Sequence, residues 1–131
     1  MRYIFLASWA VIAAAAHGGV DPAKVDTPGV VALSEASPGH WVFRQFPSLS
    51  NLYIRDQDIA GGKSTCVIKD GCAAAWPPLV AADGEKPVGD WTIIEREFDR
   101  KQWAYKGKPV YLRYHDLPGN GAEEGFRLLV P

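Results

Sequence analysis

The chain has 131 residues, of which 22% are charged, and its formal net charge at neutral pH is −1. This length suits one domain and is too short for an assembly of several. No basic run stands out along the sequence, so nucleic acid and anionic membrane surfaces are poor candidate partners.

The first sixteen residues have the composition of a secretory signal peptide. Arg2 precedes an uncharged segment, residues 3–16, which is shorter than the roughly 20 residues that a membrane-spanning helix needs. The segment ends in the small alanines that signal peptidase requires. We predict cleavage after Ala16 and a protein of the periplasm or the extracellular medium, with no membrane span after cleavage. An uncleaved membrane anchor is the alternative.

Residues 17–38 are rich in Gly, Pro, Ala, Ser and Asp, which predicts a flexible leader. Within this leader, only the apolar run at residues 30–33 has the character of an edge strand. The predicted folded domain therefore covers residues 39–131.

From residue 40 onward, short aromatic and β-branched runs alternate with turn residues, as in a sheet. The predicted strands are residues 40–44, 51–56, 91–98, 101–106, 110–114 and 126–130. Asp99 and Arg100 form a connection short enough for a hairpin. The one short helix is expected at residues 72–76, where Pro77 and Pro78 end it. The fold class is mainly β: a small antiparallel sheet domain.

The two cysteines, Cys66 and Cys72, are six positions apart. In an exported chain, two thiols at this spacing predict a disulfide. The spacing differs from the C-x-x-C pattern of redox and zinc sites, and no histidine lies near the pair in the sequence.

Two segments of the chain match each other, residues 52–61 and residues 110–119. Identical residues at one constant offset are Tyr53 and Tyr111, Arg55 and Arg113, Asp58 and Asp116, and Gly61 and Gly119. The match predicts two diverged repeats, at about residues 40–80 and 91–131, that pack as a pseudo-symmetric pair.

These residues carry a resemblance to a known family. The matching stretches are residues 52–58, 62–66, 72–79, 101–111 and 116–119, with the strings Cys-x-x-x-Trp-Pro-Pro-Leu and Tyr-Lys-Gly-Lys-Pro-Val-Tyr. The chain resembles secreted repeat proteins of unknown function, described as predicted lipoproteins with a Y-x-[FWY]-x-x-D motif. The resemblance implies export and tandem repeats, and no particular activity. Arg55 and Arg113 replace the aromatic residue of that motif, and the chain has no cysteine near the predicted cleavage point to accept a lipid.

The repeats supply the candidate ligand-binding residues. On a strand, residues i and i+2 share a face, so Tyr53 should project with Arg55, and Tyr111 with Arg113. Arginine offers a planar donor fork for carboxylate or phosphate. If the repeats pack about a two-fold axis, these four side chains would form a pocket for an anionic or aromatic ligand. The alternative is that both arginines lie on the solvent face, pairing with acidic residues or covering tyrosine rings.

Asp58 and Asp116 precede turns that contain glycine, where carboxylates commonly accept backbone N–H groups, so we predict a structural role for both. A calcium loop beginning at Asp56 is less well supported. Its fifth position is Ala60, and its twelfth is Val67, where a bidentate glutamate is needed.

No nucleophile elbow, zinc-protease motif or phosphate loop is present in the sequence, which predicts no catalytic residue and no cofactor. The predicted function is therefore that of an exported, non-catalytic module of the cell envelope that binds a small ligand or a protein partner. The alternative is a metal- or redox-linked periplasmic protein that uses His40, His115 and nearby aspartates.

Overall fold

The structure, a computed structural model, describes residues 19–116 and 122–131, without the side chains of Asp116 and Glu123. The predicted signal peptide lies outside the described residues. The described part is mainly β, as the sequence predicts, with seven strands in one two-stranded and one five-stranded sheet. All of the strand pairings are antiparallel. No helix in the described part is long and apolar enough to cross a membrane.

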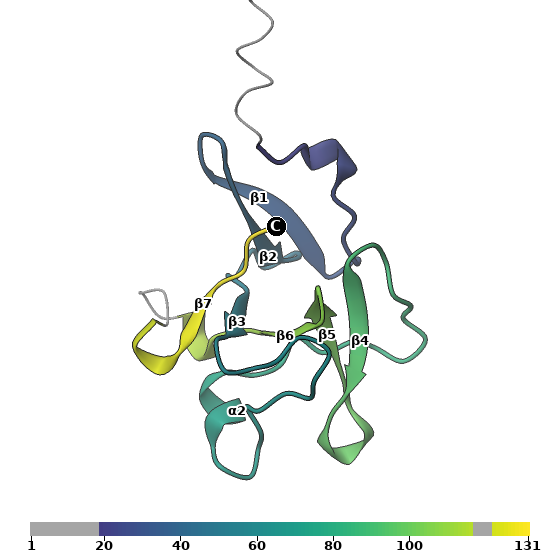
Figure 1. The fold of residues 1–131 in the computed structure, drawn as a ribbon, viewed down its shortest axis with the longest axis vertical. Coiled ribbons are helices and arrows are strands. Elements are labelled where there is room, and N and C mark those ends of the chain that lie inside the picture. Colours follow the sequence, from purple (N-terminus) through teal and green to yellow (C-terminus); the bar gives the residue numbers. More distant parts are fainter. Residues whose placement is uncertain (1–18, 117–121) are drawn as a thin grey trace, which may run out of the picture.

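The smaller sheet is a hairpin of β1 (Val31–Ser37) and β2 (His40–Gln45) at one end of the molecule (Figure 1). Strand β1 lies within the segment 17–38, for which the composition predicts a flexible leader. It is ordered here because Val31 is buried and Leu33 packs against the core. The strand signal at residues 30–33 is therefore the start of a longer strand.

The larger sheet has the strand order β4-β5-β6-β3-β7. Its strands are β3 (Tyr53–Arg55), β4 (Trp91–Glu95), β5 (Lys101–Tyr105), β6 (Lys108–Tyr111) and β7 (Phe126–Leu128). Strands β3 and β6, from the two matching segments of the sequence, are direct neighbours, with Tyr53 opposite Tyr111. The common origin of these segments as repeats stays a prediction.

The remaining elements are single turns of helix. They are η1 (Pro22–Lys24), α2 (Cys72–Ala75), η2 (Glu97–Asp99), η3 (Tyr114–Asp116) and η4 (Ala122–Glu124). Helix α2 is the short helix that the sequence predicts beside the disulfide loop. It ends where Trp76 leaves helical geometry, just before two prolines that cannot continue a helix.

The segment 77–81 fills a gap between β5 and β6. These two strands pair with each other only near their connecting turn, at Ala104 and Tyr105. Farther along, the N–H of Leu79 donates to the carbonyl of Val110, and the carbonyl of Leu79 accepts from the N–H of Trp103. The chain that leaves the disulfide loop is thereby fixed in the sheet.

This insertion explains why β5 is more buried than its alternating pattern predicts. Four of its five residues are buried, including Gln102 on the side expected to face solvent. The Gln102 amide donates to the carbonyl of Val110 and accepts from Arg96, so the buried polar group is satisfied.

Two apolar clusters hold the domain together. The larger one joins the hairpin to the five-stranded sheet and is built from Val31, Phe43, Leu52, Leu79, Ala81, Trp91, Trp103, Tyr105, Val110 and Leu129. The smaller one lies beneath the disulfide loop and contains Tyr53, Cys66, Trp76, Tyr111 and Phe126. Most tryptophans of the described chain therefore serve as core residues.

Gly107 provides a test of the packing at the β5–β6 turn. Its φ is +84°, and an added Cβ would lie 2.8 Å from the backbone nitrogen of Gly61. Gly107→Ala should combine a left-handed backbone penalty of about 1–2 kcal/mol with a backbone clash. Gly39→Ala is the matched control, because Gly39 has a φ of +79° with nothing within 4 Å of the added atom.

We expect Gly107→Ala to lower the free energy of unfolding, measured by urea denaturation, by at least about 1 kcal/mol more than Gly39→Ala does. Equal losses for the two variants would contradict the close approach of the β5–β6 turn to the backbone of Gly61.

Candidate functional site

The two tyrosines of the predicted ligand site are core residues in the structure. Tyr53 and Tyr111 are both fully buried and lie opposite each other in the sheet. Tyr53 packs edge-on against Trp76, with ring centroids 5.0 Å apart, and Tyr111 packs edge-on against Phe126 at 5.4 Å. Their rings stabilise the smaller cluster and present no surface to a ligand.

The two arginines cover a stacked aromatic pair. The rings of Trp76 and Phe126 are nearly parallel, with centroids 3.9 Å apart. The guanidinium of Arg55 lies 5.4 Å from the centroid of Phe126, and that of Arg113 lies 5.1 Å from the centroid of Trp76. Each ring has one face against the other ring, so each arginine takes an outer face. Both charges thus stabilise the stack through cation–π contacts.

Acidic and hydroxyl groups fix these arginines in place. The carboxylate of Glu124 pairs with Arg113 at 3.1 Å and accepts the indole N–H of Trp76 at 2.9 Å. Arg55 donates to the hydroxyl oxygen of Thr65 at 3.0 Å. The structure therefore brings the predicted residues to one cluster, where they act as packing groups.

Asp58 organises the loop that leads to the disulfide. Its carboxylate accepts hydrogen bonds from the backbone N–H and the hydroxyl of Thr65, and from the hydroxyl of Tyr111. Asp58 is buried, and these three donors satisfy its carboxylate. Its sequence counterpart, Asp116, ends η3, and the side chain of Asp116 lies outside the described atoms.

Ser64 and Tyr111 are close enough to suggest a nucleophile and a base, with their hydroxyl oxygens 2.6 Å apart. Burial raises the pKa of Tyr111, and the hydrogen bond to Asp58 raises it further. The phenol therefore keeps its proton, which it donates to Asp58, and it is unable to take the proton of Ser64. This chain of hydroxyls serves the fold and does not activate Ser64.

The histidines of the alternative metal site are exposed residues on separate elements. His40 begins β2 beside the hairpin turn, and His115 lies in η3, where its ring stacks on Tyr114. Within residues 19–116 and 122–131, no group of three histidines, cysteines or acidic residues is placed to hold a metal ion.

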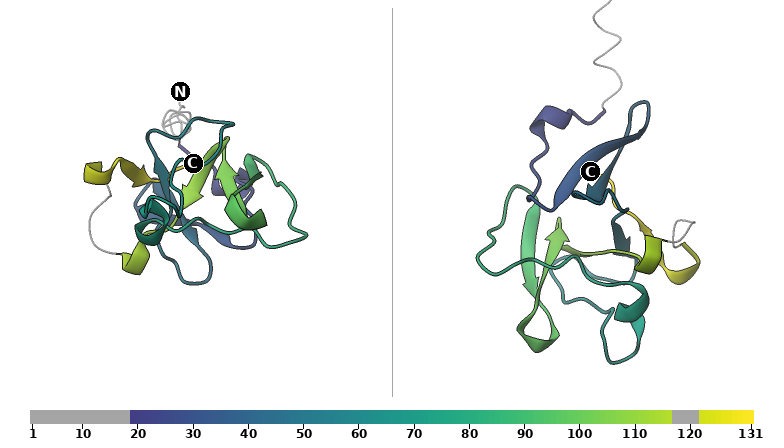
Figure 2. Two further views of the ribbon diagram at one scale, coloured as in Figure 1. Left: turned by 90° about the horizontal axis from the view of Figure 1, so that it is seen from below. Right: turned by 180° about the vertical axis from the view of Figure 1, so that it is seen from behind.

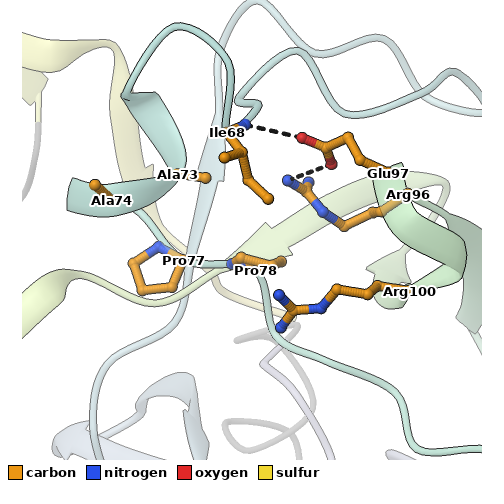
Figure 3. Close-up of a pocket in the computed structure, with 8 residues that line it drawn as sticks. All are labelled: Ile68, Ala73, Ala74, Pro77, Pro78, Arg96, Glu97 and Arg100. Carbon is orange, nitrogen blue, oxygen red and sulfur yellow. Dashed lines mark hydrogen bonds and ion pairs between the residues drawn. The ribbon is translucent and has the colours of Figure 1, made fainter.

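A cleft of about 230 Å³ lies between the disulfide loop and the tip of the β4–β5 hairpin (Figure 3). Both elements are at the end of the molecule opposite the β1–β2 hairpin (Figures 1 and 2). The apolar wall of the cleft consists of Ile68, Ala73, Ala74, Pro77 and Pro78. The Cys66–Cys72 disulfide closes the loop that carries Ile68, and Ala73 and Ala74 lie in helix α2, which begins at Cys72.

The opposite wall of the cleft is charged. Arg96, Glu97 and Arg100 come from the β4–β5 hairpin, and in Figure 3 both arginine side chains extend across toward the apolar wall. The Arg96 side chain is only 3% exposed and is fully engaged. It donates to Gln102 and to the carbonyl of Cys66, and it pairs with Glu97 at 3.0 Å.

Glu97 joins the hairpin to the disulfide loop. Besides pairing with Arg96, its carboxylate accepts the backbone N–H of Ile68 at 2.8 Å. The hydrogen bond from Ile68 lowers the pKa of Glu97, and Arg96 and Arg100 lower it further. Arg100, by contrast, makes no side-chain hydrogen bond or ion pair with any described residue. With Arg96 and Glu97 neutralising each other, the cleft has one unpaired positive charge.

The turn between Glu97 and Arg100, two residues that line the cleft, holds an exposed aromatic residue in a strained conformation. Residues 96–100 connect β4 to β5, and the two central positions of the turn, Phe98 and Asp99, have φ angles of +58° and +56°; 80% of Phe98 is exposed. Two-residue hairpin turns of this kind favour Asn-Gly, and bulky residues rarely adopt a positive φ. This site was not predicted from the sequence, which favours Asp99 and Arg100 as the connection between the two strands. The signal for it is that residues 96–100, which form the connection in the structure, include neither glycine nor asparagine.

Comparison with protein families, curated proteins and solved structures finds no match for this chain. The resemblance to secreted repeat proteins therefore stays a prediction.

The lowered pKa of Glu97 predicts a pH-dependent link between the hairpin and the loop. The ionised carboxylate stabilises the fold at pH values above its ordinary range of about 4–5, and this contribution is lost as the pH falls through its lower value in the folded protein. Glu97→Gln should therefore destabilise the protein at pH 7. The difference from wild type should shrink toward pH 3 in urea denaturation.

Glu85→Gln is the control for this experiment, since the side chain of Glu85 has no hydrogen bond or ion pair in the described part of the chain. It should leave the pH profile of the wild type unchanged. A Glu97→Gln effect of the same size at every pH would contradict a stabilising ionised Glu97.

Proposed function

We propose that this chain is an exported, non-catalytic module of the cell envelope that binds a polypeptide partner in the cleft between the disulfide loop and the β4–β5 hairpin. The observation that carries the proposal is Phe98, an exposed aromatic side chain on a strained turn between two residues that line the cleft, Glu97 and Arg100. Non-glycine residues at positive φ cost about 1–3 kcal/mol each and concentrate at functional sites. Aromatic side chains, phenylalanine included, are also enriched at protein interfaces relative to the rest of the surface.

The construction of the cleft supports a preformed binding surface. One wall is fixed by the disulfide and by the pairing of residues 77–81 with the sheet, and the other by the ion pair of Arg96 and Glu97. Ile68 adds an apolar side chain that is 47% exposed. A surface held in this way loses little conformational entropy when a partner binds, which favours affinity.

Export is the second part of the proposal. The apolar segment 3–16 and the small residues before position 17 support it, and so does a disulfide, which persists in oxidising compartments. The resemblance to secreted repeat proteins agrees with the same location. In the oxidising environment of the cell envelope, the disulfide that fixes one wall of the cleft would stay intact while a partner binds.

Mass spectrometry of protein recovered from the exported fraction tests this second part. Under denaturing conditions, we expect a mass that corresponds to cleavage near Ala16, and two hydrogens fewer than the reduced chain because Cys66 and Cys72 are joined. A retained leader, or two free thiols that react with an alkylating reagent, would contradict export into an oxidising compartment.

Peptide display tests the binding function. Two libraries of random octapeptides, one with free C-termini and one with the random segment inside a longer chain, are selected against the immobilised protein. We expect at least one library to yield binders that lose about tenfold or more in affinity, measured by fluorescence polarisation, when Phe98 is replaced by serine.

Phe46→Ser is the matched control in this experiment. Phe46 is 54% exposed and follows β2, outside the cleft, so its replacement should leave peptide affinity unchanged. If neither library yields binders, or if their affinity survives Phe98→Ser, the proposed function is wrong.

A further inference from the structure

The size of the cleft limits what it can hold. Pockets that enclose drug-sized molecules typically measure about 300–1,000 Å³ and bury most of the ligand. The cleft, at about 230 Å³, is smaller and is open to solvent. A free small molecule would remain largely solvated there. A single amino-acid residue fits this volume better, provided that the rest of its chain makes contacts outside the cleft, for example with Phe98.

The charge of the cleft limits the chemistry of that residue. Arg100 is the one lining cation that makes no hydrogen bond or ion pair with a described residue, and it faces the apolar wall of Ile68 and Pro78 (Figure 3). A guanidinium forms paired hydrogen bonds with a carboxylate, and these are stronger than bonds between neutral groups. The complementary occupant therefore carries an apolar side chain and a carboxylate within a short distance of each other.

We propose, on the basis of the proposed function, that the occupant is the C-terminal residue of a partner polypeptide, with its carboxylate on Arg100 and an apolar side chain against Ile68, Pro77 and Pro78. In a C-terminal residue, the carboxylate and the side chain are attached to the same Cα, so one residue supplies both groups in a minimal volume. An internal acidic residue places its carboxylate at the end of its own side chain. The apolar group must then come from another residue. On an extended strand the next residue points to the opposite face, and the nearest residue on the same face lies roughly 7 Å farther along the chain.

Phe98 adds to the recognition of the residues that precede the terminus. It lies on the same turn as Arg100, two positions earlier, and the residue is 80% exposed. A chain that leaves the cleft past this turn would cover the ring. Recognition would then depend on the terminal carboxylate for orientation and on apolar contacts for affinity, a mode by which proteins capture chain termini.

The experiment compares peptides that differ only at the terminal group. The most enriched octapeptides from the free-terminus library are synthesised as the free acid and as the C-terminal amide, and their affinities for the full chain are measured by fluorescence polarisation. We expect the acid to bind about tenfold or more tightly than the amide. Arg100→Gln should abolish this ratio. Lys69→Gln should preserve it, because Lys69 lies on the same loop as Ile68 but does not line the cleft.

Each outcome separates the two proposals. Equal affinity of acid and amide, a ratio that survives Arg100→Gln, or enrichment from the internal library alone would overturn C-terminal recognition. In each of these cases, binders sensitive to Phe98→Ser would still support the proposed function. If both libraries fail to yield binders, both proposals fall together.

Discussion

The insertion of residues 77–81 between β5 and β6 is the constraint on which the rest of the structure depends. Backbone hydrogen bonds from Leu79 to both strands anchor this segment within the sheet. As a result, Trp76 is carried into the smaller aromatic cluster, and Pro77 and Pro78 are held at the surface as one side of the cleft. The disulfide loop is also held against the β4–β5 hairpin directly, by hydrogen bonds from the N–H of Ile68 to Glu97 and from Arg96 to the carbonyl of Cys66. The disulfide itself, which closes only a short loop, contributes about 2–2.5 kcal/mol by restricting the unfolded chain.

Charged groups occupy two different kinds of position in this domain. Hydrogen bonds or aromatic rings hold the guanidinium groups of Arg55, Arg96 and Arg113. These three charges therefore stabilise contacts within the fold. Burying such groups without partners would cost several kcal/mol, and the observed contacts reduce that cost, although the Nε of Arg55 is buried with no hydrogen-bond partner in the described chain. Arg100 has no such contact in the described chain, and neither does the ring of Phe98. Arg100 and Phe98 lie on the same connection between β4 and β5, so one turn presents both a cation without an ion pair and an exposed aromatic ring.

Much of the fold can be predicted from local patterns in the sequence, because strands and turns leave a signature in neighbouring residues. The alternation of polar and aromatic residues predicted β5, and the two prolines predicted the end of α2. The spacing of the two cysteines predicted the disulfide. The burial of β5 on both faces was missed, since it depends on residues 77–81 pairing with a strand some twenty positions away. The cleft was missed for the same reason: Ile68 and Glu97 come together only through the tertiary fold. The Tyr–Arg pattern was visible in the sequence, but its i, i+2 spacing is equally compatible with a pocket and with a packed aromatic cluster.

At the turn of Phe98 and Asp99, local preference and observed structure disagree. A connection that only joined β4 to β5 would be more stable with Asn-Gly, because both positions have positive φ. The phenylalanine does not recover this cost by burial, since most of its surface is exposed. The adjacent Glu97, in contrast, is held by an ion pair with Arg96 and by a hydrogen bond from the backbone N–H of Ile68. The residue that begins the strained turn is therefore fixed in position. An exposed aromatic side chain next to a rigidly held residue is the arrangement expected of a contact surface. The free energy that the strained turn costs in folding is then recovered when a partner covers the ring.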